Sequence, residues 1–241
     1  MTNKQQINKL KDNAELAWAS YGYFHYFLEQ HNKPDYIDKV HYIDAKDENG
    51  KDKLDNNNKK VKRPIEITDI LDMNYKKCDV FEYNSFLKRY DRIGTLDGDF
   101  GKIQLQQFFE RYDLLKHCPN TDSGFSATLF KDTKADSKDL EYTLAIRGTE
   151  FKLDQIQDLL NDYYIGTNNS DMNRVIEQYF DMLLFYEETL KPLMQEKGIA
   201  KINVIGHSLG GYLAQLFALS YPSIINEVYT YNAPLESKRV A

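Results

Sequence analysis

The sequence predicts an α/β fold, a mostly parallel sheet flanked by helices. Two observations carry this prediction. Along the second half of the 241-residue chain, short apolar runs of strand length alternate with helical patterns, which is typical of parallel strands joined by helical crossovers. In addition, a glycine-rich turn separates the apolar run 202–205 from the helical pattern 213–218. The length suits one such domain with a sizeable core.

The composition argues against several classes of protein. The 31 Lys and Arg residues against 37 Asp and Glu residues give a formal net charge of −6, and no basic stripe is visible, so nucleic acid is a poor candidate partner. Cys78 and Cys118 are the only cysteines, and their spacing predicts no disulfide framework. No metal or cofactor is expected.

The location of the protein is predicted from the same features. Residues 1–13 are polar and lack an apolar run after their lysines, which argues against a cleaved secretory signal. No stretch approaches about 18 apolar residues, so no membrane span is expected. We therefore expect a cytoplasmic protein, while export without a cleaved signal stays open.

The first part of the chain, 1–123, is expected to be a helical region. Mixed three- and four-residue spacings predict helices over 13–27 and 103–115. The aromatic face of the first is expected to pack on the core rather than on lipid. The polar segment 44–63 has almost nothing to bury, so a mobile surface loop is expected there. Its cations near 59–63 could attract anionic headgroups, although a solvated charge run is the default interpretation.

The second part, 124–241, is expected to form the sheet and its helices. Two strands, 124–131 and 140–147, flank a polar loop and predict a hairpin at the edge of the sheet. A long helix is expected over 173–195, bent near Pro192 because proline cannot donate the helical hydrogen bond. This helix leads into the strand before the glycine-rich turn.

The turn itself, 206–211, reads Gly-His-Ser-Leu-Gly-Gly. A serine on such a turn is held in a strained conformation with its hydroxyl above the end of the sheet, and small neighbours let strand and helix come close. The pattern therefore predicts a nucleophile elbow with Ser208 as the nucleophile. The alternative is a glycine-rich connection that binds a phosphate or nothing.

A second loop fits the same chemistry. The apolar strand 142–146 runs into Arg-Gly-Thr-Glu, and a glycine followed by a hydroxyl residue at the carboxyl end of a strand is where a hydrolase would place an oxyanion donor. If the two strands are neighbours, the backbone N–H groups of Thr149 and Leu209 would face one carbonyl oxygen. Acyl transfer also needs a base and a group that orients it.

Together these motifs resemble the class 3, or fungal-type, lipase family of α/β-hydrolases. The matching pieces are Leu-Ala-Ile-Arg-Gly-Thr at 144–149, Leu-Leu-Asn-Asp at 159–162, the turn at 206–211 and Tyr-Thr-Tyr-Asn-Ala-Pro at 229–234. The resemblance covers roughly 124–234. It implies an α/β-hydrolase fold, Ser208 as nucleophile and Thr149 and Leu209 as oxyanion donors. The implied substrate is a glycerolipid ester, either a triacylglycerol or a phospholipid.

The sequence departs from the family pattern at the acid and base. The family triad runs Ser, Asp, His along the chain, but no Asp and no His follows Ser208 here. His207 is adjacent to Ser208, so its ring should point away from the hydroxyl, and Glu236 lies earlier than family order puts the acid. We expect a chain that stops before its C-terminal strands, its acid and its base, and that has low activity as a result.

Several alternatives stay open. The main one is a non-catalytic protein that keeps the hydrolase shape to bind lipid or a protein partner. A base recruited from the earlier part of the chain would be His25, His31, His41 or His117. Loss of the elements after 231 would leave an uncovered strand edge, so self-association is expected. Peripheral contact with a membrane surface would accompany a lipid substrate.

Overall fold

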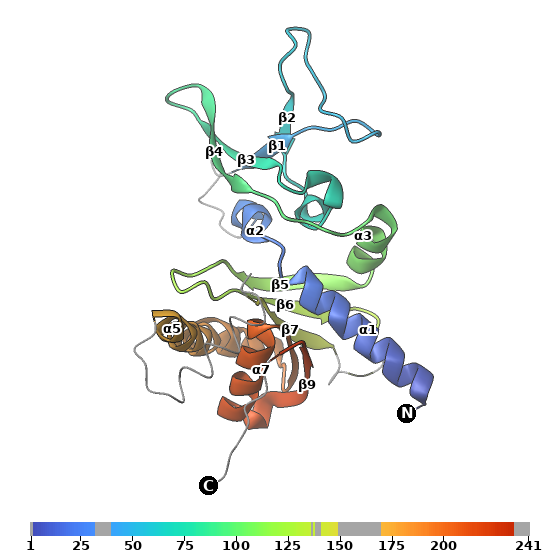
Figure 1. Cartoon of the computed structure of the whole chain (residues 1–241), viewed down its shortest axis with the longest axis vertical. Coiled ribbons are helices and arrows are strands. Elements are labelled where there is room, and N and C mark those ends of the chain that lie inside the picture. The colour runs from blue at the N-terminus through green and yellow to red at the C-terminus, as the bar shows by residue number, and fades with distance from the viewer. Residues whose placement is uncertain (1, 32–39, 136, 138–140, 149–169, 234–241) are drawn as a thin grey trace. The chain divides into compact units, whose positions relative to one another are not determined.

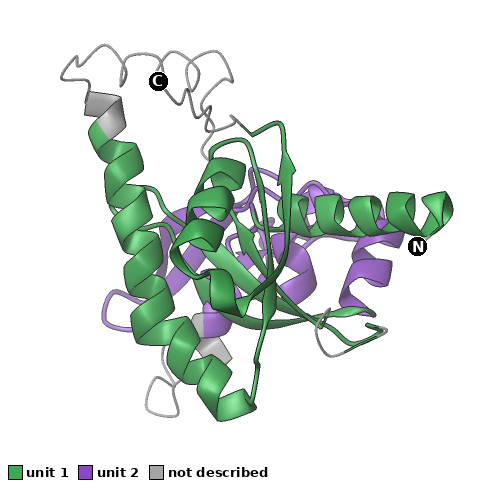
Figure 2. Ribbon diagram, turned by 90° about the horizontal axis from the view of Figure 1, so that it is seen from below, with its two compact units in different colours: residues 1–20, 111–241 green, residues 21–110 purple. Residues whose placement is uncertain are grey.

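The computed structural model describes residues 2–31, 40–135, 137, 141–148 and 170–233 (Figure 1). The chain divides into two compact units, residues 1–20 with 111–241 and residues 21–110 (Figure 2). This division differs from the boundary expected between 123 and 124. The reason is that α1 (Asn3–Ala19) packs on strands formed late in the sequence.

The first unit contains a five-stranded sheet in the order β5-β6-β7-β8-β9. The strands are β5 (Tyr112–Cys118), β6 (Ala127–Asp132), β7 (Tyr142–Ile146), β8 (Ile202–His207) and β9 (Ile225–Tyr231). The pairs β7-β8 and β8-β9 are parallel, whereas β5-β6 and β6-β7 are antiparallel. The predicted α/β architecture is confirmed, with a mixed sheet in place of a mostly parallel one.

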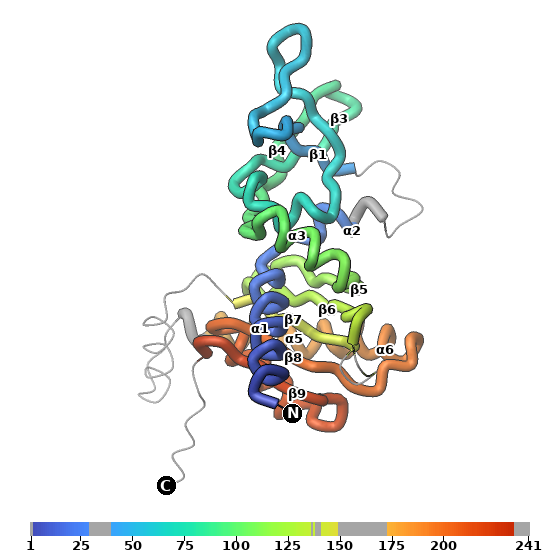
Figure 3. The backbone as a smooth tube through the Cα atoms, turned by 90° about the vertical axis from the view of Figure 1, so that its right-hand side faces the viewer, coloured from blue at the N-terminus to red at the C-terminus, as the bar shows by residue number. Residues whose placement is uncertain are grey.

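Helices cover both faces of this sheet (Figures 1 and 3). On one face α1 contacts β7, β8 and β9, and on the other α7 (Leu209–Ser220) packs against β8 and β9. Side chains alternate between the faces of a strand, so Leu144 and Ile146 point to the α7 side, where they join a core with Val204 and Leu213. All four side chains are at most 1% exposed.

Two predicted elements of this unit differ in the structure. The predicted hairpin forms as β6 and β7, but β5 pairs with β6 on its other side, so the hairpin is not at the edge of the sheet. Residues 112–115, expected as the end of a helix, belong to β5. Here pairing with β6, which is distant along the chain, outweighs the local helical spacing.

The long helix before β8 is interrupted by a π-helical turn. It consists of α5 (Ser170–Phe185), the π-turn Tyr186–Leu190 and α6 (Lys191–Lys197). Pro192 lies at the start of α6 and has no N–H to offer the preceding turn, which is a common cause of such irregularity. Gly198 then ends α6 in the left-handed conformation, at φ 65°.

The second unit holds an antiparallel sheet in the order β2-β1-β3-β4. The strands are β1 (His41–Asp44), β2 (Lys62–Pro64), β3 (Asp79–Asn84) and β4 (Arg89–Thr95), and the helices are α2 (His25–His31) and α3 (Lys102–Phe109), with short 3₁₀ turns at Ile67–Ile70 and Met73–Tyr75. Ile43 and Val80 are fully buried under one face. A sheet therefore occupies part of the chain that was expected to be helical.

The predicted helix over 13–27 is replaced by α1 and α2. The first begins ten residues earlier than expected, because Thr2 and Gln5 form a capping box in which each side chain bonds to the other residue's backbone. Between the helices lies Gly22, where a Cβ would come within 2.8 Å of the Leu71 side chain. This close approach leaves little room for a side chain at the break between the two helices.

The polar segment 44–63, expected as a mobile loop, forms two successive hairpins of one design. Asp47 Oδ1 accepts the N–H groups of Asn49 and Lys51 at 2.8 and 2.9 Å. Asp55 Oδ1 accepts those of Asn57 and Lys59, each at 2.8 Å. Aspartate side chains thus organise both turns without any apolar burial.

Candidate active site

The turn between β8 and α7 holds Ser208 in a strained backbone conformation. Its φ of 56° and ψ of −127° lie in a region that residues with a side chain rarely adopt. The Ser208 N–H donates to the carbonyl oxygen of Tyr231 at 2.9 Å, while its own carbonyl accepts from Gly211 and Tyr212 at 3.0 and 3.2 Å. The turn is therefore tied to both β9 and α7. The predicted strand-turn-helix position of Ser208 is confirmed.

Glycines let the elements around this turn approach closely. A Cβ on Gly206 would lie 2.2 Å from the backbone of Gly210. One on Gly210 would lie 2.3 Å from the carbonyl oxygen of Ile146 and 2.8 Å from the nitrogen of Gly148. The start of α7 is thus in direct contact with the carboxyl end of β7. The two loops predicted to serve one oxyanion begin at this contact.

The start of α7 offers backbone donors beside Ser208. The first N–H groups of a helix have no acceptor within the helix, and they carry the positive end of its dipole. Leu209 is the first residue of α7, so its N–H is one of these groups. Thr149, the other predicted donor, lies outside the described residues. The convergence of the Thr149 and Leu209 N–H groups therefore stays a prediction.

His207 precedes Ser208 and is only partly exposed. Removal of its imidazole from water disfavours the charged form and lowers its pKa below the usual value. Burial therefore favours the uncharged form of this ring.

The other described histidines have contacts elsewhere. His117 lies on β5, three strands from β8, which is about 14 Å across the sheet. Its Nδ1 lies 2.9 Å from the hydroxyl of Thr128. In the second unit, His41 Nδ1 lies 2.9 Å from the carbonyl oxygen of Tyr26, and the rings of His25 and Tyr26 are 4.1 Å apart. The described residues thus identify no base for Ser208, and neither Glu236 nor the side chain of His31 is among them.

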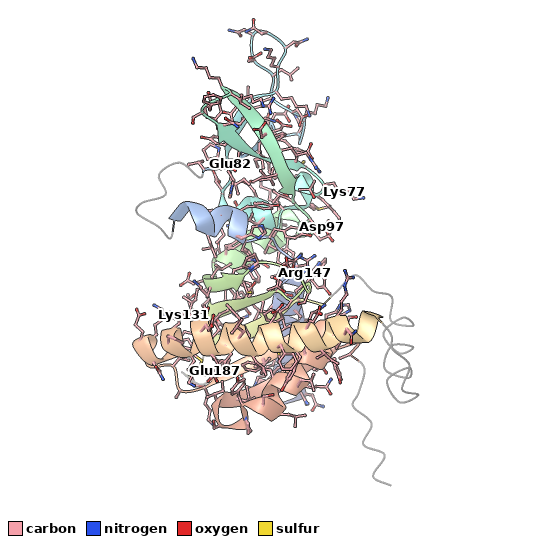
Figure 4. The ribbon with its side chains drawn as sticks, turned by 90° about the vertical axis from the view of Figure 1, so that its left-hand side faces the viewer. Lys77, Glu82, Asp97, Lys131, Arg147 and Glu187 are labelled. Carbon is pink, nitrogen blue, oxygen red and sulfur yellow. The ribbon has the colours of Figure 1, made fainter. Side chains whose placement is uncertain are left out.

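Arg147 is a buried charged residue at this edge of the sheet (Figure 4). The sequence motif at 144–149 contains it but predicts no role for it. Arg147 is 9% exposed and directly follows β7. Its N–H donates to the carbonyl oxygen of Ser126 at 3.0 Å, and its Nη1 donates to Asn120 Oδ1 at 3.4 Å. These bonds fix the start of the loop that continues past Gly148.

Ala233 is a second residue whose structural role the sequence did not reveal. A Cβ on Gly211 would lie 2.6 Å from the Cβ of Ala233, so the segment after β9 packs directly on the first turn of α7. Asn232, which lies between the end of β9 and Ala233, adopts a φ of 48°. The Asn-Ala-Pro motif was the available signal, because asparagine tolerates this conformation and alanine leaves room for the helix.

The chain is similar in part to known proteins. A family model described as alpha/beta hydrolase fold matches residues 148–239. The chain is similar to the Lip2 lipase of Yarrowia lipolytica, at 22% identity and a TM-score of 0.39 over 55% of this chain and 49% of that one. It is also similar to lipase II of Rhizopus niveus, at 13% identity and a TM-score of 0.48 over 97% and 64%. Protein ECM18 of Saccharomyces cerevisiae is 36% identical over 66 residues, which are 27% of this chain and 14% of that protein.

The chain thus spans about half the length of the Lip2 lipase. The family match agrees with the parallel order β7-β8-β9 and with the strained serine at the head of α7. The expected α/β-hydrolase-like fold is thus confirmed, and the chain is similar to α/β hydrolases over residues 148–239. The resemblance to the class 3, or fungal-type, lipases rests on the sequence motifs at 144–149, 206–211 and 229–234.

No helix in the described part of the chain combines the length and the apolar character needed to cross a bilayer. In the same residues, no group of three His, Cys, Asp or Glu side chains is arranged to hold a metal ion.

Proposed function

We propose that this chain is a serine ester hydrolase of the lipase type, with Ser208 as its nucleophile. The observation that carries the proposal is the φ of 56° at Ser208, where a buried parallel strand meets a helix. Such strain persists only where the surrounding structure enforces it, and it is concentrated at active sites. The bond from Ser208 to Tyr231 and the glycine contacts of α7 supply that enforcement.

In the proposed reaction, the Ser208 oxygen attacks the ester carbonyl carbon and its proton passes to a base. The carbonyl oxygen becomes an oxyanion, and its collapse breaks the ester C–O bond. The proton held by the base passes to the departing oxygen, which leaves as the alcohol, and water then hydrolyses the acyl group from Ser208 to release the carboxylic acid. The N–H groups of Leu209 and Thr149 would stabilise that oxyanion. A single donor of this kind contributes about 3–4 kcal/mol to the transition state.

We propose glycerolipid esters as the substrate class, triacylglycerols or phospholipids. The support is the set of lipase motifs at 144–149, 206–211 and 229–234. The structures of similar fold are lipases by name. Short-chain esters of p-nitrophenol contain the same reactive carbonyl and serve as soluble probes.

Turnover by this chain is proposed to be low. A serine without a base is a poor nucleophile near neutral pH, and the loss of a triad member leaves about 10³–10⁴-fold acceleration over water. No Asp or His follows Ser208, and the described histidines have contacts elsewhere. An external base should therefore raise the rate.

Imidazole supplies such a base. Hydrolysis of p-nitrophenyl butyrate is measured with increasing imidazole for the native chain and for Ser208→Ala, and the reaction of imidazole alone is subtracted. The proposal predicts a gain with the native chain that Ser208→Ala lacks. Equal rates for the two proteins at every imidazole concentration would favour a non-catalytic protein that binds lipid or a protein partner.

Self-association is proposed through β9. This strand is last in the sheet order of the described residues, and none of the strands among them pairs with its outer edge, which would allow pairing with a second copy. Size-exclusion chromatography at several protein concentrations tests this, because a dimer predicts elution that shifts with dilution. A monomer at all concentrations would contradict it.

A further inference from the structure

The hairpin that joins β3 and β4 ends in two exposed apolar side chains. Phe86 is 91% exposed and Leu87 is 49% exposed. The turn is well defined, because the Leu87 N–H donates to Asn84 Oδ1 at 2.9 Å and Lys88 adopts a φ of 51°. We call residues 84–89 the hairpin tip. It keeps an aromatic ring in water, although burial of apolar surface is favourable by about 25 cal/mol per Å².

Two tyrosines lie directly behind the hairpin tip. Tyr83 of β3 and Tyr90 of β4 are cross-strand partners, with ring centroids 5.1 Å apart. They are 42% and 40% exposed. Tyrosine combines an apolar ring with a polar hydroxyl, which suits the boundary between water and acyl chains.

Cationic residues complete the arrangement. Lys88 and Arg89 follow the apolar pair, and no acidic residue occurs between 83 and 90. The Arg89 Nε bonds to Asp91 Oδ1 at 2.7 Å, so one of the two cations is partly balanced from behind the tip. From the end of the hairpin inward, the order is therefore apolar side chains with adjacent cations, then the tyrosines, then the cross-strand acidic residues Glu82 and Asp91, of which Asp91 bonds to Arg89.

We propose that the hairpin tip inserts into the surface of an anionic lipid bilayer. Phe86 and Leu87 would enter the acyl-chain boundary, with Tyr83 and Tyr90 at the level of the headgroups and Lys88 near lipid phosphates. One strand residue and one turn residue on each side, Asn84 with Ser85 and Arg89 with Lys88, separate the tyrosine pair from Phe86 and Leu87, which is at most about 7 Å. That length matches the roughly 5–10 Å to which interfacial elements enter a membrane.

Area and charge favour lipid over a protein partner. One exposed aromatic ring and one leucine present far less than the roughly 800 Å² that each partner buries in a standard protein interface. A fluid bilayer needs no shape complementarity, and anionic headgroups attract nearby Lys and Arg side chains. The proposal does not depend on Ser208. The β3–β4 hairpin belongs to the second unit (Figure 1), and Figure 4 labels Glu82 of its strand β3.

A single tryptophan reports insertion. The chain has one Trp, at position 18, so Phe86→Trp in a Trp18→Phe background places the only indole at the hairpin tip. With vesicles of phosphatidylcholine and phosphatidylserine, we expect a blue-shifted emission and quenching by brominated acyl chains. The matched control is Ile103→Trp in the same background, since Ile103 is 74% exposed on α3. Its emission should not change, and an unchanged emission from position 86 would overturn the proposal.

Vesicle sedimentation supplies a second readout. Phe86→Ser combined with Leu87→Ser should lower the partition coefficient about tenfold or more, whereas Ile103→Ser should not. Lys88→Glu should weaken binding to anionic vesicles and leave the low binding to phosphatidylcholine alone unchanged. Circular dichroism confirms that each variant is folded, and folded hairpin variants that bind like the native chain would overturn the proposal.

The two proposals can fail separately. Ser208→Ala should bind vesicles as the native chain does, because it lies far from the hairpin in sequence and in a different unit. Phe86→Ser with Leu87→Ser should leave hydrolysis of the soluble p-nitrophenyl ester unchanged. Loss of vesicle binding in Ser208→Ala would contradict an insertion site confined to the hairpin tip.

Discussion

The N–H of Ser208 donates a 2.9 Å hydrogen bond to the carbonyl oxygen of Tyr231. Tyr231 is the last residue of β9, which runs parallel to β8 and pairs with it directly. The bond therefore holds the strained serine at the edge where the carboxyl ends of two parallel strands meet. Ligand sites of α/β proteins typically lie at this edge.

The backbone strain at Ser208 can be measured as a difference in the free energy of unfolding between two variants. Glycine adopts positive φ without the penalty of a Cβ, whereas alanine keeps that penalty. We expect Ser208→Gly to be more stable than Ser208→Ala by about 1–2 kcal/mol. Urea unfolding at neutral pH gives the difference, and equal free energies of unfolding would show that the turn is not strained.

Close contact between α7 and β7 predicts the effect of one added methyl group. In Gly210→Ala the new Cβ would meet the carbonyl oxygen of Ile146 at 2.3 Å, and backbone cannot swing away as a flexible side chain can. We expect a loss of about 2–3 kcal/mol in the free energy of unfolding. Gly101→Ala is the control, because no atom lies within 4 Å of its added Cβ. A similar loss in both variants would argue against the contact.

Burial of His207 predicts a dependence of stability on pH. Its pKa is lowered in the folded chain, so as pH falls below about 6.5 the unfolded chain takes up the proton first. The burial of neutral His207 therefore contributes its full stability at pH values above the pKa of this imidazole in the unfolded chain. That contribution is lost as the pH falls toward the lower pKa of the imidazole in the folded chain. His207→Gln should therefore lose less stability than the native chain between neutral and mildly acidic pH. Urea unfolding at both conditions tests this, and equal losses would contradict it.

Local chemistry explains which parts of the fold could be predicted. The strand, turn and helix around Ser208 follow from residues adjacent in sequence: an apolar run, a glycine-flanked serine and an apolar helix face. The pair β6-β7 was likewise visible as two apolar runs around a polar loop. In each case, the residues that determine the element lie within it or next to it.

Long-range pairing and very short elements explain what could not be predicted. The strand β5 forms because β6 pairs with it, and its sequence alone has helical spacing. In the second unit, β1 and β2 have four and three residues, too few to show a period of two. The capping box of Thr2 and Gln5 was present in the sequence as a local signal, although the helix was predicted to start later. At the site, no sequence signal identified a base, and the described residues identify none.

Covalent labelling by a fluorophosphonate tests the assignment of the nucleophile most directly. The probe reacts when a serine oxygen attacks phosphorus and fluoride leaves, and donors such as the Leu209 N–H would stabilise the charged phosphoryl oxygen. Intact mass spectra and peptide maps are compared for the native chain and Ser208→Ala, with Ser220 at the exposed end of α7 as an internal reference. We predict one adduct, on Ser208, which forms faster than any at Ser220, is accelerated by imidazole and is absent from Ser208→Ala. Labelling of Ser208 no faster than of Ser220, or the same adduct in Ser208→Ala, would contradict the assignment.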